Sequence, residues 1–208
     1  MKIKMKPLEY NYGDFEPYIS AKTMSEHYEG LYRDYVVKLN QVINSIDYSV
    51  SVDQLLMSIQ DYPIKRNDII RYAGGVSNHE LFFDSLTRKR TKPNKNLSEA
   101  IVKSFGSYDQ MIENITTVSE SLFGSGYVFL VIEDDDLAII KTVNQNSPLI
   151  YNFYPLIAID LWEHSYFLDY LSKRNQYIES IMKLLNWDNA NDLYAKYTRN
   201  IRNGIYSL

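Results

Sequence analysis

The chain has 208 residues and a formal net charge of -4, from 22 Lys and Arg against 26 Asp and Glu. It contains no Cys and only three His, and its 19 Tyr outnumber its 8 Phe and 2 Trp. Without Cys there is no disulfide scaffold, thiolate metal site, iron–sulfur cluster or cysteine nucleophile, so any metal site must use His and carboxylates. The 45% of hydrophobic and 23% of charged residues are typical of a globular protein with a packed core.

The acidic balance does not favour binding to nucleic acid or to acidic membranes. The longest apolar run, residues 127–132, is far shorter than the roughly 20 residues of a membrane-spanning helix. The basic residues at the start of the chain lead to Pro7 without an apolar segment, so we expect no signal peptide there. We therefore expect a soluble, cytoplasmic protein that binds neither nucleic acid nor membrane.

Apolar and aromatic side chains recur every three or four residues over 20–46, which predicts a long helix with Ser20 as its N-cap. A short helical stretch is predicted over 52–60 and a second long helix over 64–86. Gly74 and Gly75 lie inside this second helix, where each costs about 1 kcal/mol relative to Ala. We expect that something packs there too closely for a side chain. The two long helices predict an antiparallel hairpin.

The polar segment 87–95, interrupted by a proline, divides the chain into two predicted domains, 1–92 and 93–208. The segment is basic, but the acidic total and the absence of interleaved aromatic residues favour a solvated connection over a nucleic-acid site. Helices are predicted from about Ser98 and from Ser107, which opens a capping-box pattern. Gly124 is placed to end the second of these helices.

Two β-rich runs, 127–132 and 137–140, flank the acidic residues 133–136 and predict a hairpin. The acidic cluster lacks the Gly and the distal Glu of a calcium loop, so a solvated turn is favoured. A third strand over 156–159 leads into Asp160, and helices follow over these ranges: 166–171, 176–185 and 189–202. The predicted class is α+β, with an N-terminal long α-helical hairpin followed by an α/β half that holds a three-stranded antiparallel sheet.

The three histidines are candidate metal ligands. His27 and His79 lie in the two long helices, which a hairpin can bring together. His164 follows Asp160 by four residues where a strand passes into a helix, so carboxylate and imidazole can converge on one ion. Three nitrogens and one oxygen suit iron, manganese or zinc better than magnesium or calcium. On spacing alone the alternative stays open, because a lone helical His is more often a surface or hydrogen-bonded residue.

Five short stretches follow one another along the chain: AKTMSEH (21–27), AGGVSNH (73–79), FGSG (123–126), NQNSPL (144–149) and DLWEH (160–164). In order and spacing they resemble the successive motifs of iron/manganese superoxide dismutases, and the resemblance runs over residues 7–194. The Asp-x-Trp-Glu-His element is highly specific. The resemblance implies a homodimeric enzyme that converts superoxide to oxygen and hydrogen peroxide without an organic cofactor.

The resemblance also implies a metal site between the two domains. Its four protein ligands are His27, His79, Asp160 and His164, with a water or hydroxide as the fifth ligand. One manganese or iron ion is expected per chain. Manganese is slightly preferred, because manganese members of the family have Gly at the position of Gly75 and Gln at that of Gln145, whereas many iron members supply the Gln from the former position.

Five further residues match functional positions of the family. Tyr35 matches the Tyr that guards the substrate channel, and Gln145 the Gln that hydrogen-bonds the metal-bound solvent. Trp162 matches an aromatic wall of the site. Glu163 matches a residue that reaches across the dimer interface to a ligand His of the partner, and Arg174 a basic residue in the funnel that attracts superoxide.

The chain departs from the family at positions around the site. Leu31 and Phe167 replace a His and a Tyr that commonly pair across the dimer, so we expect a weakened or altered dimer. Three residues stand where Trp is usual: Phe83, Tyr127 and Phe129. Tyr127 retains a hydroxyl that can donate to Gln145. These departures motivate a second hypothesis, a non-catalytic metal-binding relative with the same fold.

Overall fold

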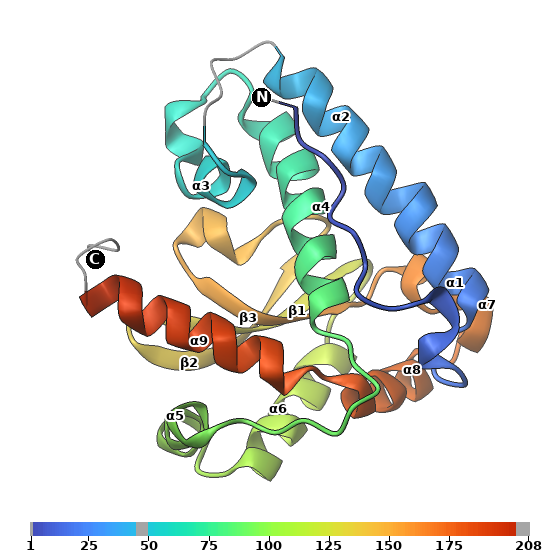
Figure 1. The fold of residues 1–208 in the computed structure, drawn as a ribbon, viewed down its shortest axis with the longest axis vertical. Helices are drawn as coiled ribbons and strands as arrows, with labels where there is room; N and C mark the ends of the chain where they lie inside the picture. Colours follow the sequence, from blue (N-terminus) through green and yellow to red (C-terminus); the bar gives the residue numbers. More distant parts are fainter. Residues whose placement is uncertain (1, 45–49, 203–208) are drawn as a thin grey trace.

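The computed structural model of the chain describes residues 2–44 and 50–202. Its N-terminal half is an antiparallel pair of long helical segments, shown in blue and green in Figure 1. The first segment consists of α1 (Ala21–Ser25), a π-helical stretch (Glu26–Tyr32) and α2 (Arg33–Ile43). The second is α4 (Arg66–Asp84), which packs against α2. The predicted helical hairpin is therefore confirmed, with residues 45 and 46 of the first predicted helix outside the described residues.

The first helical segment begins as predicted, because the Ser20 side chain accepts a hydrogen bond from the Thr23 backbone N–H at 3.1 Å. The periodicity predicted α-helix throughout, whereas the structure contains the π-helical stretch, whose wider turn shifts the register of later residues. Such stretches are rare and often occur at functional sites. This one carries His27.

The glycine pair of α4 lies where two other parts of the chain come closest to the helix. A Cβ on Gly74 would stand 2.1 Å from the carbonyl oxygen of Gln145, and one on Gly75 would stand 2.3 Å from Tyr35 Cδ1. The predicted close packing is confirmed. Before α4 the chain forms α3 (Val52–Met57) and a short 3-10 turn (Ile59–Asp61).

The segment 87–95 crosses to the second half with its Lys and Arg residues exposed, as expected of a solvated connection. The division into domains 1–92 and 93–208 stays a prediction. Helix α5 (Lys95–Phe105) begins earlier than the predicted start near Ser98, because Asn94 caps it. Helix α6 (Tyr108–Glu120) is capped by Ser107 as predicted but ends before Gly124, which lies in the following loop with φ +77°.

The sheet has three antiparallel strands in the order β2-β1-β3, which confirms the predicted fold class. The strands are β1 (Gly126–Glu133), β2 (Asp136–Val143) and β3 (Tyr154–Asp160). Asp134 and Asp135 have φ of 47° and 67° and form the two-residue turn of the first hairpin. Both are exposed, so the predicted solvated turn is confirmed.

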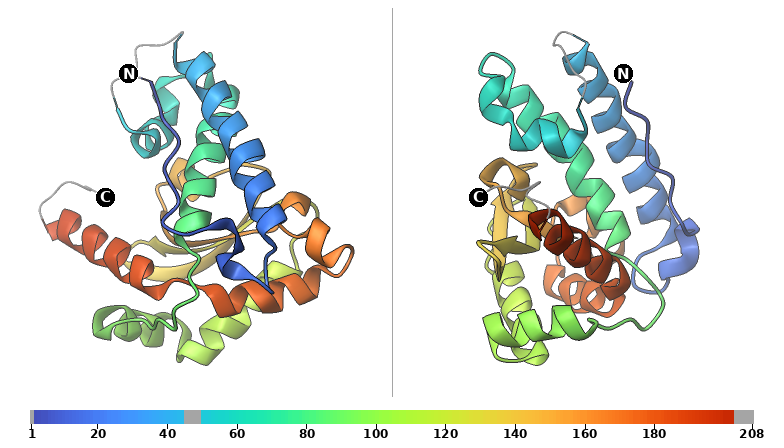
Figure 2. Two further views of the ribbon diagram at one scale, coloured as in Figure 1. Left: turned by 45° about the vertical axis from the view of Figure 1, so that its right-hand side comes forward. Right: turned by 60° about the vertical axis from the view of Figure 1, so that its left-hand side comes forward.

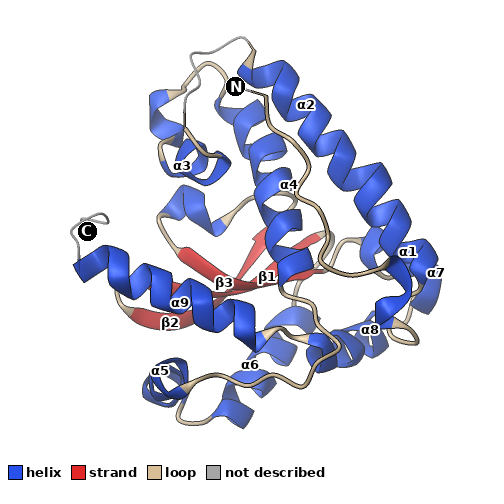
Figure 3. Cartoon of the chain, in the orientation of Figure 1, coloured by secondary structure: helices blue, strands red, loops and turns tan. Residues whose placement is uncertain are grey.

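The sheet lies between the helical hairpin above and α5 and α6 below, as Figure 3 shows. The last helices are α7 (Phe167–Tyr170), α8 (Arg174–Ile181) and α9 (Trp187–Arg202), and α9 and α4 both contact β3 (Figure 2). Within the described ranges, no helix is both long and apolar enough to cross a membrane.

Candidate metal centre

Four possible ligands from distant parts of the chain meet between the helical hairpin and the sheet. They come from the π-helical stretch (His27), from α4 (His79), from the end of β3 (Asp160) and from the 3-10 turn Glu163–Ser165 (His164). One nitrogen of each His and one oxygen of Asp160 all lie within 4.8 Å of one another. The structure thus brings together all four predicted ligands.

The spacing of these atoms fits a single ion. Asp160 Oδ2 lies 3.3 Å from both His27 Nε2 and His164 Nε2. Two ligands that each bind a first-row metal at roughly 2.1 Å stand about 3.0–3.6 Å apart when they are neighbours around it. His27 Nε2 and His79 Nε2 are buried and make no hydrogen bond of normal geometry within the described residues. Buried nitrogens of this kind are costly unless an ion or another partner engages them.

Hydrogen bonds from outside the cluster orient two of its members. Nδ1 of His79 lies 2.6 Å from the carbonyl oxygen of Gly75, so this nitrogen carries the proton and Nε2 offers its lone pair to the centre. Asp160 Oδ1 accepts from the Trp162 backbone N–H at 2.8 Å, which leaves Oδ2 for the centre. These two ligands are therefore held in place by the protein itself.

The electrostatics keep the ligands in the forms that bind metal. Burial, more than the neighbouring charges, lowers the pKa of His27 and lowers the pKa of His79 to about 3, so both imidazoles are neutral at pH 7. Burial alone would raise the pKa of Asp160, but the interactions of its carboxylate with the imidazoles of His164 and His27 outweigh burial and lower that pKa. The cluster therefore offers neutral nitrogens from His27 and His79 and one anionic oxygen from Asp160.

Tyr35 and Gln145 both reach the cluster. The Tyr35 ring lies 5.2 Å from that of His79, centroid to centroid. The Gln145 side chain is buried, and neither of its amide atoms makes a hydrogen bond of normal geometry within the described residues. Burial raises the pKa of Tyr35, and the Gln145 side chain lies close enough to that phenol to oppose the shift. Asn78 holds the Gln145 backbone through a 3.1 Å hydrogen bond to its carbonyl.

The positions where the family usually has Trp form an aromatic cage. Phe83 packs against His27 at 5.2 Å, and Phe129 stacks on Tyr127 at 5.7 Å. The Tyr127 hydroxyl lies 3.4 Å from Nδ1 of His79. The predicted donation from this hydroxyl to Gln145 does not have normal hydrogen-bond geometry. Burial and the nearby Asp160 carboxylate raise the pKa of Tyr127 well above its ordinary value, and the neighbouring Gln145 amide opposes that shift.

The remaining predicted residues lie further out. Trp162 stacks on His164 with ring centroids 5.6 Å apart, and its Nε1 donates to the Asn144 carbonyl. Glu163 is exposed and accepts a 2.7 Å hydrogen bond from Ser125. Arg174 donates to the carbonyl oxygens of the loop that precedes β1, at 2.9 Å to Leu122, so within the chain it positions that loop.

Two residues that support Asp160 were not predicted from the sequence. The Tyr177 hydroxyl donates to the Asp160 carbonyl at 2.9 Å, and the Ser165 hydroxyl lies within hydrogen-bonding distance of the same carbonyl, at 2.9 Å, and of the Trp162 carbonyl, at 2.6 Å. Ser165 directly follows the Asp-x-Trp-Glu-His element, which is a signal that a search of the motif's flanks would use. Tyr177 lies in α8 among apolar residues, and no pattern in the sequence distinguishes it from core packing.

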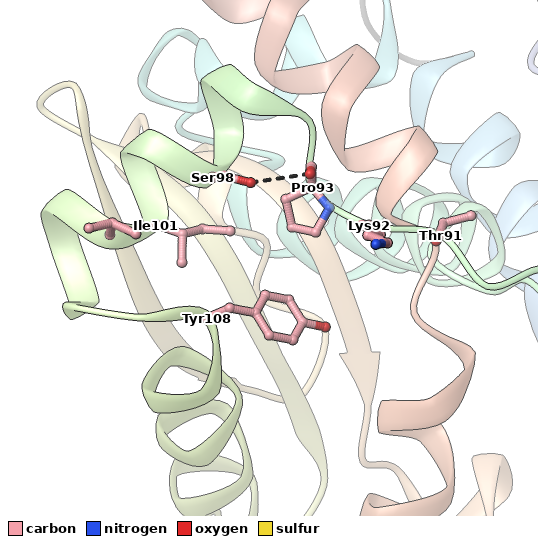
Figure 4. A pocket seen from close by; sticks show the side chains of 7 residues that line it. Thr91, Lys92, Pro93, Ser98, Ile101 and Tyr108 are labelled. Carbon is pink, nitrogen blue, oxygen red and sulfur yellow. Dashed lines mark hydrogen bonds between the residues drawn. The ribbon is translucent and has the colours of Figure 1, made fainter.

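A surface pocket of ≈ 350 Å³ lies beside α5 (Figure 4), and none of its lining residues belongs to the cluster. Ile101, Val102 and Tyr108 supply much of its wall, and Lys92 is its charged residue. No His or carboxylate lines it, so it is not a metal site.

Three His and one Asp converge between the helical hairpin and the α/β domain. This fold and this site are those of a protein that binds a single metal ion. Two family models match the chain: the α-hairpin domain of iron/manganese superoxide dismutases over residues 2–87, and their C-terminal domain over residues 93–193. The chain belongs to the iron/manganese superoxide dismutase family, and it is a metal-dependent oxidoreductase.

Curated relatives agree with this assignment, and each is named a manganese superoxide dismutase. The protein of Thermus thermophilus is 35% identical over 198 residues, which cover 93% of this chain and 97% of the relative. That of Listeria monocytogenes is 34% identical over 195 residues, covering 92% and 96%. That of Buchnera aphidicola is 32% identical over 204 residues, covering 94% and 100%.

Proposed function

We propose that His27, His79, Asp160 and His164 bind one manganese or iron ion and that superoxide is disproportionated there. The observation that carries the proposal is the convergence of the four ligand atoms within 4.8 Å, with buried His Nε2 atoms that make no hydrogen bond of normal geometry. The reaction converts two superoxide ions and two protons into one oxygen and one hydrogen peroxide. When bound, the ion supplies the one-electron couple for the two half-reactions.

The protein supplies charge, orientation and protons. The anionic Asp160 favours the higher oxidation state of the bound ion, because its buried charge partly neutralises the cation. Tyr35 and Tyr127 have raised pKa values, first because they are buried, so both phenols keep their protons at neutral pH and can donate hydrogen bonds at the site. The buried Gln145 amide offers a donor and an acceptor beside them.

We propose manganese as the preferred ion. In this chain Gln145 reaches the site from the loop after β2, and the Tyr35 ring occupies the space beside Gly75. A Gln at position 75, as many iron members of the family have, does not fit there without displacing Tyr35. The names of the curated relatives support the same choice.

We further propose a homodimer in the cytoplasm. Phe123 is 97% exposed, and Phe167 and Leu168 are 50% and 54% exposed. The hydrogen bond between Ser125 and Glu163 joins the loop of Phe123 to the segment that leads to Phe167. Exposed apolar residues grouped in this way are typical of a surface that another chain covers. The cytoplasmic location is a prediction from the sequence alone.

The competing function is metal binding without turnover, motivated by Leu31 and Phe167, which remove the usual polar pair of the dimer interface. The two functions separate when the metal-free protein is loaded with manganese or with iron and the metal content and superoxide consumption of each form are measured. We expect about one ion per chain and turnover that is lost in His79→Ala. A fully loaded protein with the native fold and no turnover with either metal would favour the competing function.

A further inference from the structure

A row of tyrosine rings leads away from one proposed ligand and has no part in the reaction described above. The Tyr32 ring stacks on that of His79, with centroids 6.2 Å apart. Tyr28 lies 5.5 Å from Tyr32, and Tyr12 lies 6.3 Å from Tyr28. Tyr32 is fully buried, whereas Tyr28 and Tyr12 are half-buried. This tyrosine row (Tyr32, Tyr28 and Tyr12) therefore connects the centre to the protein surface.

The two ends of the tyrosine row are hydrogen-bonded to carboxylates. Tyr32 donates to Glu80 Oε1 at 2.7 Å, and Tyr12 donates to Glu29 Oε1 at 2.7 Å. The hydroxyl of the middle residue, Tyr28, donates to a backbone carbonyl. An oxidised phenol is a very strong acid, so a Tyr loses an electron most easily when a base takes its proton. A carboxylate is such a base and a carbonyl oxygen is not. The ends are thus suited to hold a radical and the middle to pass an electron.

We propose that the tyrosine row carries oxidising equivalents from the metal centre to the surface, with hydrogen peroxide as the oxidant. The inference rests on the proposed function, which places a redox ion beside His79 and forms peroxide there. Reduction of one hydrogen peroxide to two waters takes two electrons and two protons. Tyr12 first loses one electron, which passes through Tyr28 and Tyr32, and Tyr32 then loses one electron of its own; each of the two also loses one proton and becomes a neutral radical.

The protons leave through the hydrogen-bonded carboxylates, Glu80 at the inner end and Glu29 at the outer end, and end on the two waters. The consequence is protective, because oxidation then falls on tyrosine side chains instead of on the imidazole of His79. Rings that served only to fill space would not require carboxylate partners at both ends. Phe82 and Phe83, which pack on His27, are of this space-filling kind.

The test uses the full-length protein loaded with iron, with metal content and superoxide turnover measured on the same sample. After hydrogen peroxide is added, freeze-quench electron paramagnetic resonance detects tyrosyl radicals and peptide mass spectrometry locates the oxidised residues. We expect oxidation at Tyr32 and Tyr12. In Tyr28→Phe we expect oxidation at Tyr12 to be lost, that at Tyr32 to remain, and oxidation of His79 to increase. Equal oxidation of Tyr12 with and without Tyr28 would overturn the proposal.

Glu29→Gln provides a second variant that keeps a hydrogen-bond acceptor but removes the base, and we expect it to lose the Tyr12 radical alone. Tyr108→Phe, in a tyrosine that packs on Trp187 far from the row, is the matched control and should behave as the unmodified protein. The metal-free protein should show no Tyr12 oxidation; equal oxidation there would mean direct attack from solvent and would also overturn the proposal. Turnover without oxidation of the row refutes this inference alone, whereas failure to bind either iron or manganese refutes the proposed function as well.

Discussion

The Tyr35 ring fills the space beside Gly75, where a Cβ would stand only 2.3 Å from Tyr35 Cδ1. Real Cβ atoms essentially never approach another heavy atom within 3.0 Å, so a side chain at position 75 would move the ring. The same ring packs against His79. The glycine therefore determines where the Tyr35 hydroxyl lies relative to the centre.

Gly75→Ala should lower superoxide turnover about tenfold and lower the free energy of unfolding by no more than about 2 kcal/mol. The displaced Tyr35 ring is expected to cost about tenfold in turnover, or roughly 1.4 kcal/mol. Overpacking costs about 1–3 kcal/mol, and the better helix propensity of Ala returns about 1 kcal/mol. Turnover and urea unfolding of the same preparation check this.

Gly74→Ala is the matched comparison, because its Cβ would meet the backbone oxygen of Gln145 at 2.1 Å, and a backbone atom cannot swing aside. We expect a larger loss of stability there than at Gly75, at or beyond the roughly 3 kcal/mol end of the overpacking range. Equal stability of the two variants would contradict this account.

Gln145→Leu separates a functional amide from a structural one. Neither amide atom of Gln145 makes a hydrogen bond of normal geometry within the described residues, so an apolar side chain of similar size removes no such bond. We expect the free energy of unfolding of the metal-free protein to change by less than about 1 kcal/mol. Turnover should fall by about 10–100-fold, as is typical when a residue that supports a metal centre is lost.

The contrasting variant for Gln145→Leu is Asn78→Ala. It removes the hydrogen bond to the Gln145 carbonyl and should cost about 1–3 kcal/mol of stability, because a buried acceptor is left unsatisfied. If Gln145→Leu instead lost as much stability as Asn78→Ala, the amide would be structural.

Asp160→Asn tests the one anionic ligand. The amide keeps an oxygen for the hydrogen bond from the Trp162 N–H but removes the negative charge 3.3 Å from two His nitrogens. We expect metal affinity to fall by at least about 100-fold while circular dichroism shows the same fold.

In the unmodified protein, metal at 100 times its dissociation constant should add about 2.7 kcal/mol to the free energy of unfolding, and a chelator should remove this gain. If metal stabilised Asp160→Asn by as much as it stabilises the unmodified protein, Asp160 would be excluded as a ligand.

The sequence predicts the hairpin and the sheet well, because long periodic helices and alternating strands depend on local patterns. The close packing at Gly74 and Gly75 could be predicted for a similar reason, since glycine inside a helix has a cost that requires an explanation. The start of α5 differs from the prediction because Asn94 caps the helix by accepting a hydrogen bond from the Leu97 N–H.

The centre itself was predicted by its motifs and not by spacing, because the convergence of four residues requires the tertiary fold. The π-helical stretch around His27 was beyond prediction, since its residues have no distinct pattern. The two hydroxyls that hold the Asp160 carbonyl, from Ser165 and Tyr177, come from different elements. Arg174 matches a funnel position by motif, yet its hydrogen bonds to the loop carbonyls become evident only once the loop and α8 are placed together.

Phe123→Asp tests the proposed dimer. Phe123 is 97% exposed, so within one chain its replacement should change the free energy of unfolding by no more than about 0.5 kcal/mol. If the partner covers Phe123, burial of each ring contributes about 1.5–3 kcal/mol, and its loss in both copies should raise the dimer dissociation constant by at least about 100-fold. Sedimentation equilibrium measures this change, and Ile64→Asp, at a residue 94% exposed on the segment before α4, is the matched control that should leave the dimer intact. A dimer equally stable in both variants would place the interface elsewhere, and an unmodified protein that sediments as a monomer would refute the dimer.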